Sequence, residues 1–288
     1  MPAYSTQKTA EESGLSISEI ESYLDFAKQA ARIGGGILME NYGNLLSIKN
    51  KGRIGDLVTN ADTTSEEAIL KYLKQSTPKF KIIAEESGTG GQSSDLAWSI
   101  DPLDGTTNYA HGFPFFATSI GLMWKNKPLL GAISVPFFKE LYWAAPGVGS
   151  FCNDSDIKIS GCERLEESLL VTGFAYDRQT VIDNNYAEYC WLTHRTRGVR
   201  RAGAAAVDLA FVAAGRLDGY WERGLSPWDL TAGVAIVDIA GGKVSDYKSD
   251  TFCQDTGRVL ACTPGIEKEL KTELKKVRPL SKDIYDQS

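Results

Sequence analysis

Residues 97–108 constrain the fold more than any other stretch of the chain, because they join a short apolar run to two aspartates. Residues 97–100 predict a short buried strand, and Pro102 is expected to end it cleanly. Asp101 and Asp104 would then lie, three residues apart, on a stiff loop at the end of that strand. Carboxylate oxygens held in this way favour a hard cation such as Mg²⁺ or Ca²⁺ over metals that prefer thiolate ligands.

Gly105 and the small polar residues after it add a second chemical feature to the same loop. Glycine lets a ligand approach the backbone closely, and exposed N–H groups at residues 105–107 favour an anion such as phosphate. A metal ion beside a phosphate group indicates phosphoryl chemistry. The alternative is purely structural, because Asp-Pro and Asp-Gly pairs are common in turns that bind nothing.

Charge and cysteine content narrow the classes of protein to which the chain can belong. The 288 residues carry a net charge of −6, which disfavours general binding to nucleic acid or to an anionic membrane. Clustered carboxylates would also repel a phosphate ester, so a bound cation is required. Five cysteines without a C-x-x-C pair predict reduced thiols in a cytoplasmic protein, and two histidines argue against a histidine-based zinc site.

The chain is long enough for one large folded unit. No apolar run approaches the roughly 18 residues that a membrane-spanning helix needs. Residues 1–15 are polar and predict a flexible N-terminal tail. Residues 16–288 then form a single catalytic unit of two subdomains, with a boundary near residue 150.

Apolar periodicity predicts several helices. A capping box at Ser16 and Glu19 opens a helix that continues to Leu38, although residues 34–36 are all glycine and interrupt the pattern. A second helix is expected to be capped by residues 62–65. Later helices are expected at residues 184–193, 203–214, 227–240 and 264–276, after a strand meander between residues 116 and 144. Strands and helices alternate irregularly, which argues against a doubly wound fold.

Further carboxylates stand where other elements are predicted to end or begin. Glu85 and Glu86 follow a predicted strand at residues 80–84, where they form either a metal-binding pair or a solvated turn. Asp229 ends the sequence Ser-Pro-Trp-Asp, which is a helix-capping box in its own right. A carboxylate in the first turn of a helix can still point toward a metal, so cap and ligand are compatible roles.

The octapeptide Asp-Pro-Leu-Asp-Gly-Thr-Thr-Asn at residues 101–108 resembles the signature of the inositol monophosphatase family of Mg²⁺-dependent sugar phosphatases. The resemblance extends over residues 17–276, and further segments match in the order of the family: Gly55–Asp62, Glu85–Ser87, Gly203–Ala205, Tyr220–Gly224 and Trp228–Asp229. It implies a mixed α/β fold, the layered αβαβα sandwich that the family shares with fructose-1,6-bisphosphatase.

The resemblance also implies a set of metal ligands. Glu85, Asp101 and the backbone carbonyl of Leu103 would hold one Mg²⁺, and Glu85 would count among the catalytic residues. Asp101, Asp104 and Asp229 would hold a second ion, with two or three ions in all. Such a pair of ions clamps the attacking and leaving oxygens of an in-line displacement.

Catalytic and substrate contacts are implied in the same way. Thr106 would orient the attacking water and would itself be oriented by a hydrogen bond to Asp56. Glu222 would accept hydrogen bonds from two ring hydroxyls, and the alternative for this residue is an exposed glutamate at the end of a strand. The residues expected to contact substrate are Asp104, Gly105, Thr106, Ala205, Glu222 and Asp229.

The activity implied by the resemblance is Mg²⁺-dependent hydrolysis of a sugar or polyol phosphate, with inositol 1-phosphate as the first choice. Histidinol phosphate, fructose 1,6-bisphosphate and other sugar phosphates are alternatives, and a regulatory binding protein with a vestigial site is an alternative of another class. A homodimer and lithium sensitivity are also implied. The arginine-rich residues 195–201 read as solvated surface, a site for a second phosphate, or a nucleic-acid contact, and nucleic-acid binding is not expected.

Overall fold

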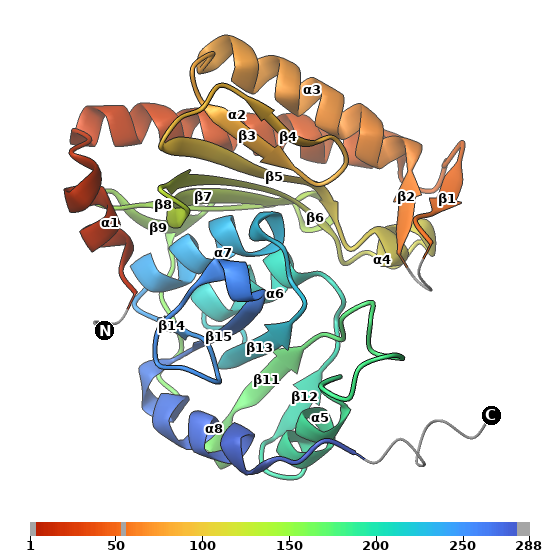
Figure 1. The fold of residues 1–288 in the computed structure, drawn as a ribbon, viewed down its shortest axis with the longest axis vertical. Helices are drawn as coiled ribbons and strands as arrows, with labels where there is room; N and C mark the ends of the chain where they lie inside the picture. Colours follow the sequence, from red (N-terminus) through yellow and green to blue (C-terminus); the bar gives the residue numbers. More distant parts are fainter. Residues whose placement is uncertain (1–3, 53–55, 281–288) are drawn as a thin grey trace.

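The computed structural model describes residues 4–52 and 56–280, which form alternating layers of helix and sheet. An eight-stranded sheet and a five-stranded sheet are separated and covered by pairs of helices (Figure 1). From top to bottom in the figure the three helical layers are α2 (Ile17–Asn41) with α3 (Asn60–Ser76), α6 (Ala205–Ala213) with α7 (Pro227–Ile239), and α5 (Tyr186–Thr193) with α8 (Pro264–Lys276). The predicted αβαβα sandwich is therefore confirmed.

Helix α2 begins as the sequence predicted, with the side chains of Ser16 and Glu19 forming a reciprocal capping box. The glycines inside it do not end the helix, because two of them allow close packing on the sheet. A Cβ atom on Gly34 would lie 2.6 Å from Thr118 Cγ2, and one on Gly35 would lie 2.5 Å from Ser134 Oγ. The helix therefore lies against the sheet at a distance that no larger side chain permits.

The eight-stranded sheet carries the first acidic loop. In spatial order its strands are β10 (Ser155–Asp156), β9 (Gly149–Cys152), β8 (Glu140–Ala145), β7 (Lys127–Val135), β6 (Ala117–Trp124), β5 (Leu96–Asp104), β3 (Lys81–Ala84) and β4 (Gly88–Gly91). Among the strands that the structure describes in this sheet, only β3 and β5 pair in parallel. Contrary to prediction, Pro102 does not end β5, because pairing with β6 resumes at Asp104 after an irregularity that follows Asp101.

The five-stranded sheet lies below α6 and α7 and consists of β12 (Gly198–Arg200), β11 (Leu169–Thr172), β13 (Gly219–Arg223), β15 (Arg258–Cys262) and β14 (Lys243–Ser245). The predicted boundary near residue 150 falls within β9, whereas the change from the first sheet to the second comes after Asp156. Helices α6 and α7 are buried nearly all round, because sheets cover them on both sides. This burial explains their almost uninterrupted apolar sequence.

Shorter elements lie around the edge of the sheets. They are the hairpin of β1 (Ile48–Asn50) and β2 (Leu57–Thr59), helix α4 (Thr106–Ala110), and three short 3₁₀ turns at Pro136–Phe138, Leu165–Glu167 and Gln254–Thr256. Helix α4 follows β5 directly and contacts β2. The loop between β1 and β2 includes residues 53–55, which lie outside the described part of the chain, and so Gly55 of the matched segment is not placed.

Residues 4–15, predicted to be a flexible tail, instead pack against the body of the protein. They form helix α1 (Thr6–Ser13), which begins at an N-cap serine. The N–H and hydroxyl of Thr6 donate to Asp238 Oδ2 at 2.8 and 2.6 Å, and the hydroxyl of Tyr4 donates to the Pro128 carbonyl at 2.8 Å. A few apolar contacts add to these hydrogen bonds, because Ala10 lies in a buried apolar cluster and the Tyr4 ring packs edge-on against Phe252. The segment has too few apolar residues for the sequence alone to predict this docking.

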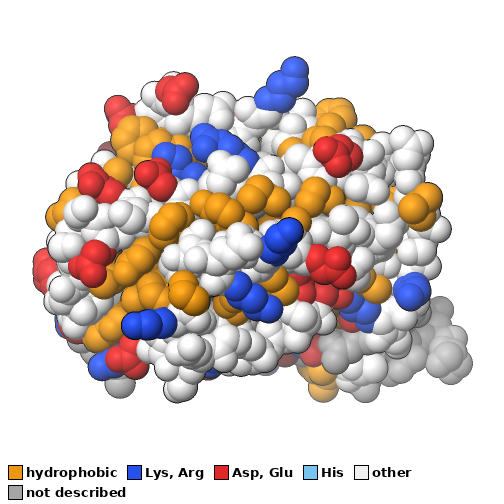
Figure 2. All heavy atoms as spheres, turned by 90° about the horizontal axis from the view of Figure 1, so that it is seen from above, with side chains coloured by type: hydrophobic (Ala, Val, Ile, Leu, Met, Phe, Trp, Pro, Cys, Tyr) orange, Lys and Arg blue, Asp and Glu red, His pale blue; other side chains and the backbone are white. Residues whose placement is uncertain are grey.

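The outer face over α2 and α3 mixes apolar side chains with charged groups of both signs (Figure 2). Lysines and arginines do not gather into one basic patch on this face. None of the helices within residues 4–52 and 56–280 is long and apolar enough to span a bilayer.

Candidate active site

Three aspartates from two distant parts of the chain meet at the end of β5. Asp101 and Asp104 lie on the irregular end of this strand, and Asp229 lies in the first turn of α7. Each offers a carboxylate oxygen, and the three oxygens all lie within 4.8 Å of one another. The fold thus brings together residues that are more than a hundred positions apart in the sequence.

Backbone N–H groups hold two of these aspartates in place. Asp104 Oδ1 and Oδ2 accept hydrogen bonds from the N–H groups of Ala205 and Ala206, at 3.1 and 2.8 Å. Asp229 Oδ2 accepts a hydrogen bond from the N–H of Ser226 at 2.6 Å, which completes the predicted capping box. Asp229 therefore caps α7 while its carboxylate also belongs to the cluster, so the two roles are compatible.

Glu85 lies beside the three aspartates in a cavity of about 360 Å³, here called the carboxylate-side cavity. Lys51 Nζ lies 3.0 Å from Glu85 Oε1 and 2.5 Å from Glu86 Oε1. The turn itself is held by Glu66 of α3, whose carboxylate accepts hydrogen bonds from the N–H groups of Glu86 and Ser87 at 2.9 and 2.8 Å. Helix α3 thus positions the second acidic pair, and Lys51 offsets its negative charge.

Burial raises the pKa of every carboxyl group in this cluster. The pKa values of Glu85 and Asp104 rise to about 7, that of Asp229 rises to about 8, and that of Asp101 rises well above its ordinary range. Neighbouring negative charges add to the effect of burial. A buried, all-oxygen donor set with this much mutual repulsion fits a hard divalent cation such as Mg²⁺.

The structure corrects the predicted partner of Thr106. Its hydroxyl oxygen lies 3.1 Å from Asp62 Oδ1 and 3.0 Å from the Leu103 carbonyl oxygen. Asp56 lines the same cavity, but the hydrogen bond expected between Thr106 and Asp56 is made to Asp62 instead. The reason is that α3 is capped by Thr59, three residues earlier than predicted, which places Asp62 in the first turn of the helix and against α4.

A second cavity of about 420 Å³ adjoins the first and is here called the substrate-side cavity. All six residues predicted to contact substrate line it: Asp104, Gly105, Thr106, Ala205, Glu222 and Asp229. Glu222 lies on β13 and accepts a hydrogen bond from the hydroxyl of Tyr220 at 2.6 Å. Burial raises the pKa of Glu222 to about 7. A Cβ atom on Gly173 would clash with this carboxylate, so any side chain there would displace it.

Comparison with known proteins identifies the chain. A model of the inositol monophosphatase family matches residues 19–279. The chain belongs to the inositol monophosphatase family. The protein named inositol-1-monophosphatase from Synechocystis sp. is 47% identical over 267 residues, which cover 92% of this chain and 93% of that protein.

Other members of the inositol monophosphatase family support the same assignment. The solved structure of an inositol monophosphatase from Anabaena (Nostoc) superposes with a TM-score of 0.84 at 48% sequence identity, covering 92% of this chain and 99% of that one. A protein from Aquifex aeolicus named fructose-1,6-bisphosphatase/inositol-1-monophosphatase is 40% identical over 228 residues, covering 78% of this chain and 86% of that protein. The chain is accordingly a phosphoric monoester hydrolase by family.

The residues that the resemblance to the inositol monophosphatase family pointed out all line one of the two cavities. Asp56, Glu85, Asp101 and Leu103 line the carboxylate-side cavity, and the remaining six line the substrate-side cavity. Sequence reasoning missed Asp62, although it ends one of the matched segments. It also missed Lys51 and Tyr176, which line the carboxylate-side cavity and for which the sequence carries no motif.

Proposed function

We propose that this chain hydrolyses phosphate monoesters of polyols and sugars in the presence of Mg²⁺, with inositol 1-phosphate as a substrate. The observation that carries the proposal is the cluster of three aspartates within 4.8 Å of one another, beside a cavity of about 420 Å³ that contains a buried glutamate. A carboxylate cluster of this kind attracts cations, and the adjoining cavity is large enough for a ring with its phosphate group.

The ligand sets follow from the position of each carboxylate. Glu85, Asp101 and the carbonyl oxygen of Leu103 would hold one Mg²⁺, and Asp101, Asp104 and Asp229 would hold a second. When bound, Mg²⁺ supplies the positive charge that makes a water molecule more acidic and stabilises the leaving oxygen. The same charge offsets the repulsion that raises the pKa values of these carboxyl groups.

Thr106 is the residue that orients the attacking water in this proposal. Its hydroxyl has one proton, which it donates to Asp62 Oδ1 or to the Leu103 carbonyl, at 3.1 or 3.0 Å. With that proton engaged, the threonine oxygen can only accept, so it accepts a hydrogen bond from the water and turns a lone pair of the water toward the phosphorus. Asp62 holds the threonine in this orientation.

The substrate is held at two ends. Gly105 and Thr106 begin α4, and the N–H groups of a helix's first turn have no partner within the helix and favour a phosphate group. Glu222 Oε2 accepts a hydrogen bond from Tyr220, which leaves Oε1 to accept a hydrogen bond from a ring hydroxyl of the substrate.

Two alternatives stay open in the proposal. The name of the Aquifex relative includes fructose-1,6-bisphosphatase, which supports sugar phosphates as further substrates. A regulatory binding protein would need no hydroxyl placed for water, so the pairing of Thr106 with Asp62 favours catalysis. The family resemblance also leads us to propose a cytoplasmic homodimer that lithium inhibits.

Phosphate release tests the proposal. We expect wild-type protein to release phosphate from inositol 1-phosphate with Mg²⁺ and not with EDTA, and Asp104→Asn to lower kcat by about a hundredfold or more. Asp95→Asn serves as the matched control, because Asp95 is exposed and its ion pair is with Lys125, away from the site. Parallel assays with histidinol phosphate and fructose 1,6-bisphosphate rank the substrates. A wild-type protein that releases no phosphate from any of these esters would refute the catalytic proposal.

A further inference from the structure

Tyr176 is an aromatic residue of the active site to which the function proposed above gives no role. It lines both cavities and lies at the boundary between them. The other residues on this boundary are the start of α4, two of the clustered aspartates and one glycine: Gly105 and Thr106, Asp104 and Asp229, and Gly224. Tyr176 therefore borders the place where the proposed function puts the phosphate group.

The side chain of Tyr176 has no partner within the fold. Among residues 4–52 and 56–280, no group forms a hydrogen bond with its hydroxyl and no other ring packs against it, and the residue is 46% exposed. Phe174, two residues earlier, is different, because its ring lies 5.1 and 5.7 Å from the centres of the Tyr186 and Tyr189 rings. Phe174 thus contributes to the packing of this segment, whereas the side chain of Tyr176 does not.

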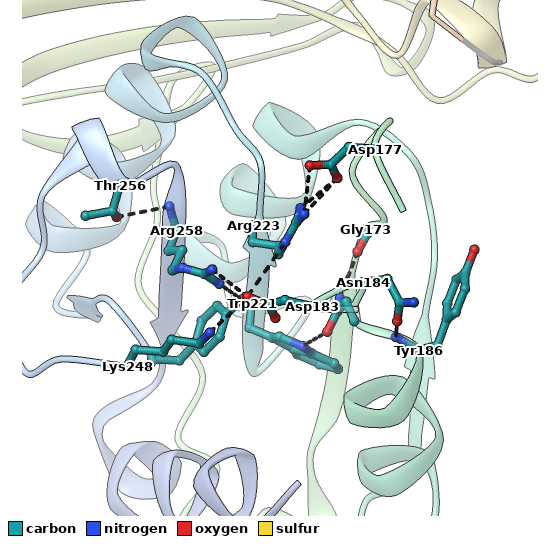
Figure 3. A network of polar contacts seen from close by, with 12 residues as sticks. Gly173, Asp177, Asp183, Asn184, Tyr186, Trp221, Arg223, Lys248, Thr256 and Arg258 are labelled. Atoms are coloured by element: carbon teal, nitrogen blue, oxygen red, sulfur yellow. Dashed lines mark hydrogen bonds and ion pairs between the residues drawn. The ribbon is translucent and has the colours of Figure 1, made fainter. Parts of the chain in front are cut away.

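The chain on either side of Tyr176 is nevertheless held in place. Asp177 accepts three hydrogen bonds from the guanidinium of Arg223, at 2.7 to 2.9 Å (Figure 3). Arg223 lies on β13 and is itself only 6% exposed. On the other side, Ala175 packs so closely on Gly224 that a Cβ atom there would lie 2.5 Å from the Ala175 Cβ. A residue that is fixed in this way, with a side chain that the fold does not use, is placed to contact a ligand.

The hydroxyl of Tyr176 lies in the electrostatic field of the carboxylate cluster. Its pKa is raised, first by burial and then by the negative charges of four carboxyl groups: Glu85, Asp56, Asp229 and Asp104. The hydroxyl therefore keeps its proton at neutral pH and can donate a hydrogen bond. A neutral donor suits this position, because a phosphate group bound among carboxylates brings acceptor oxygens, whereas an ionised phenol would repel it.

We propose that the hydroxyl of Tyr176 donates a hydrogen bond to the phosphate group of the substrate, in addition to the N–H groups at the start of α4. This inference rests on the proposed function, because it assumes that the phosphate binds beside Asp104 and Asp229. A phosphate group offers more acceptor positions than the N–H groups of Gly105 and Thr106 fill, so a further donor finds an oxygen. The contact is made in the bound ester and in the bound product alike. Its loss therefore weakens binding and leaves bond cleavage nearly unchanged.

Tyr176→Phe tests the proposal, because it removes the hydroxyl and keeps the ring. We expect KM for inositol 1-phosphate to rise about tenfold, which corresponds to about 1.4 kcal/mol, and kcat to change less than about threefold. The same factor should appear with glycerol 2-phosphate, an ester without a ring, because the contact is to the phosphate group. A contact to the ring would instead confine the loss to inositol 1-phosphate.

Binding of inorganic phosphate gives a readout that does not depend on turnover. In calorimetry with saturating Mg²⁺, Tyr176→Phe should weaken phosphate binding about tenfold and change the Kd of Mg²⁺ alone less than about twofold. Tyr72→Phe is the matched control, because Tyr72 lies on α3, lines neither cavity, and its hydroxyl forms no hydrogen bond with the described residues. It should alter none of these constants. Thermal unfolding checks that each variant is folded.

The outcomes separate this inference from the proposed function. Equal affinity of wild type and Tyr176→Phe for inorganic phosphate, or a rise in KM with inositol 1-phosphate only, would overturn the phosphate contact while leaving the phosphatase intact. An equal weakening of Mg²⁺ binding would overturn it too, because the hydroxyl would then serve the cation. If the wild type hydrolyses no ester, the proposed function fails, and the calorimetric comparison then decides whether Tyr176 contacts phosphate.

Discussion

At the scale of single residues, the hydrogen bond between Thr106 and Asp62 predicts which aspartate supports catalysis. Asp62→Asn replaces one acceptor oxygen with an amide donor, so the threonine hydroxyl loses its fixed orientation. We expect kcat for inositol 1-phosphate to fall about a hundredfold with little change in KM. Asp56→Asn should lower kcat less than about fivefold, because its carboxylate is not the partner of Thr106.

A control is needed because Asp62 also caps α3 through the N–H and hydroxyl of Thr59. Thr59→Ala removes the hydroxyl of that cap, so it should lower the free energy of unfolding by about 1 kcal/mol and leave kcat nearly unchanged. Steady-state kinetics and thermal unfolding of all three variants make the comparison. A large loss of kcat in Asp56→Asn with none in Asp62→Asn would mean that the contact seen here is only structural.

The same residues show what a sequence can predict about a site. Asp101, Asp104 and Asp229 could be assigned because each stands in a short motif at a predicted strand or helix end. Asp62 could not be distinguished from Asp56, because both stand in one matched segment and Asp62 had a sufficient local role as a helix cap. A carboxylate has two oxygens, and in the structure Asp62 uses one for the cap and the other for Thr106.

At the scale of the helix, the three consecutive glycines of α2 have unequal roles. A methyl group on Gly34 would lie 2.6 Å from Thr118 Cγ2 and 2.9 Å from Ile69 Cδ1, whereas one on Gly36 would meet no atom within 4 Å. Gly34→Ala should therefore destabilise the protein by about 1–3 kcal/mol through overpacking. Gly36→Ala should stabilise it by up to about 1 kcal/mol, because alanine is the better helix former.

Urea unfolding of the two single variants measures both effects, and each variant is the other's control because the substitution is the same. Stabilisation by both would show that α2 can move away from the sheet without loss of stability.

The sequence predicted the start of α2 from its capping box, but whether the glycines ended the helix depended on the distance to β6. Local sequence carries no information about that distance. The continuation of β5 beyond Pro102 was missed for a similar reason, since it depends on pairing with β6.

At the scale of the whole molecule, the order of layers could be predicted because the family resemblance covers most of the chain, not because of any local pattern. The docking of α1 could not be predicted, since it depends on a hydrogen bond between Thr6 and Asp238, a residue 232 positions away.

The charge of the active site also has a consequence for the whole molecule. Ionised carboxyl groups that are buried beside one another repel each other in the folded protein. This repulsion lowers the free energy of unfolding until a cation binds.

Stability should therefore depend on pH and on Mg²⁺ in a defined direction. Burial raises the pKa of Asp229 to about 8 in the folded protein, which is above the pKa of this group in the unfolded chain. The contribution of this group to the free energy of unfolding is therefore fully present below about pH 4 and is lost as the pH rises toward 8. Without metal, Asp229→Asn should become progressively more stable than wild type between pH 5 and pH 8, by about 1 kcal/mol per pH unit. At pH 8, saturating Mg²⁺ should stabilise the wild type by about 2–3 kcal/mol and the variant much less. Urea unfolding in EDTA and in Mg²⁺ tests both statements. If the stability difference between wild type and Asp229→Asn did not change with pH, ionised Asp229 would not be the source of the repulsion.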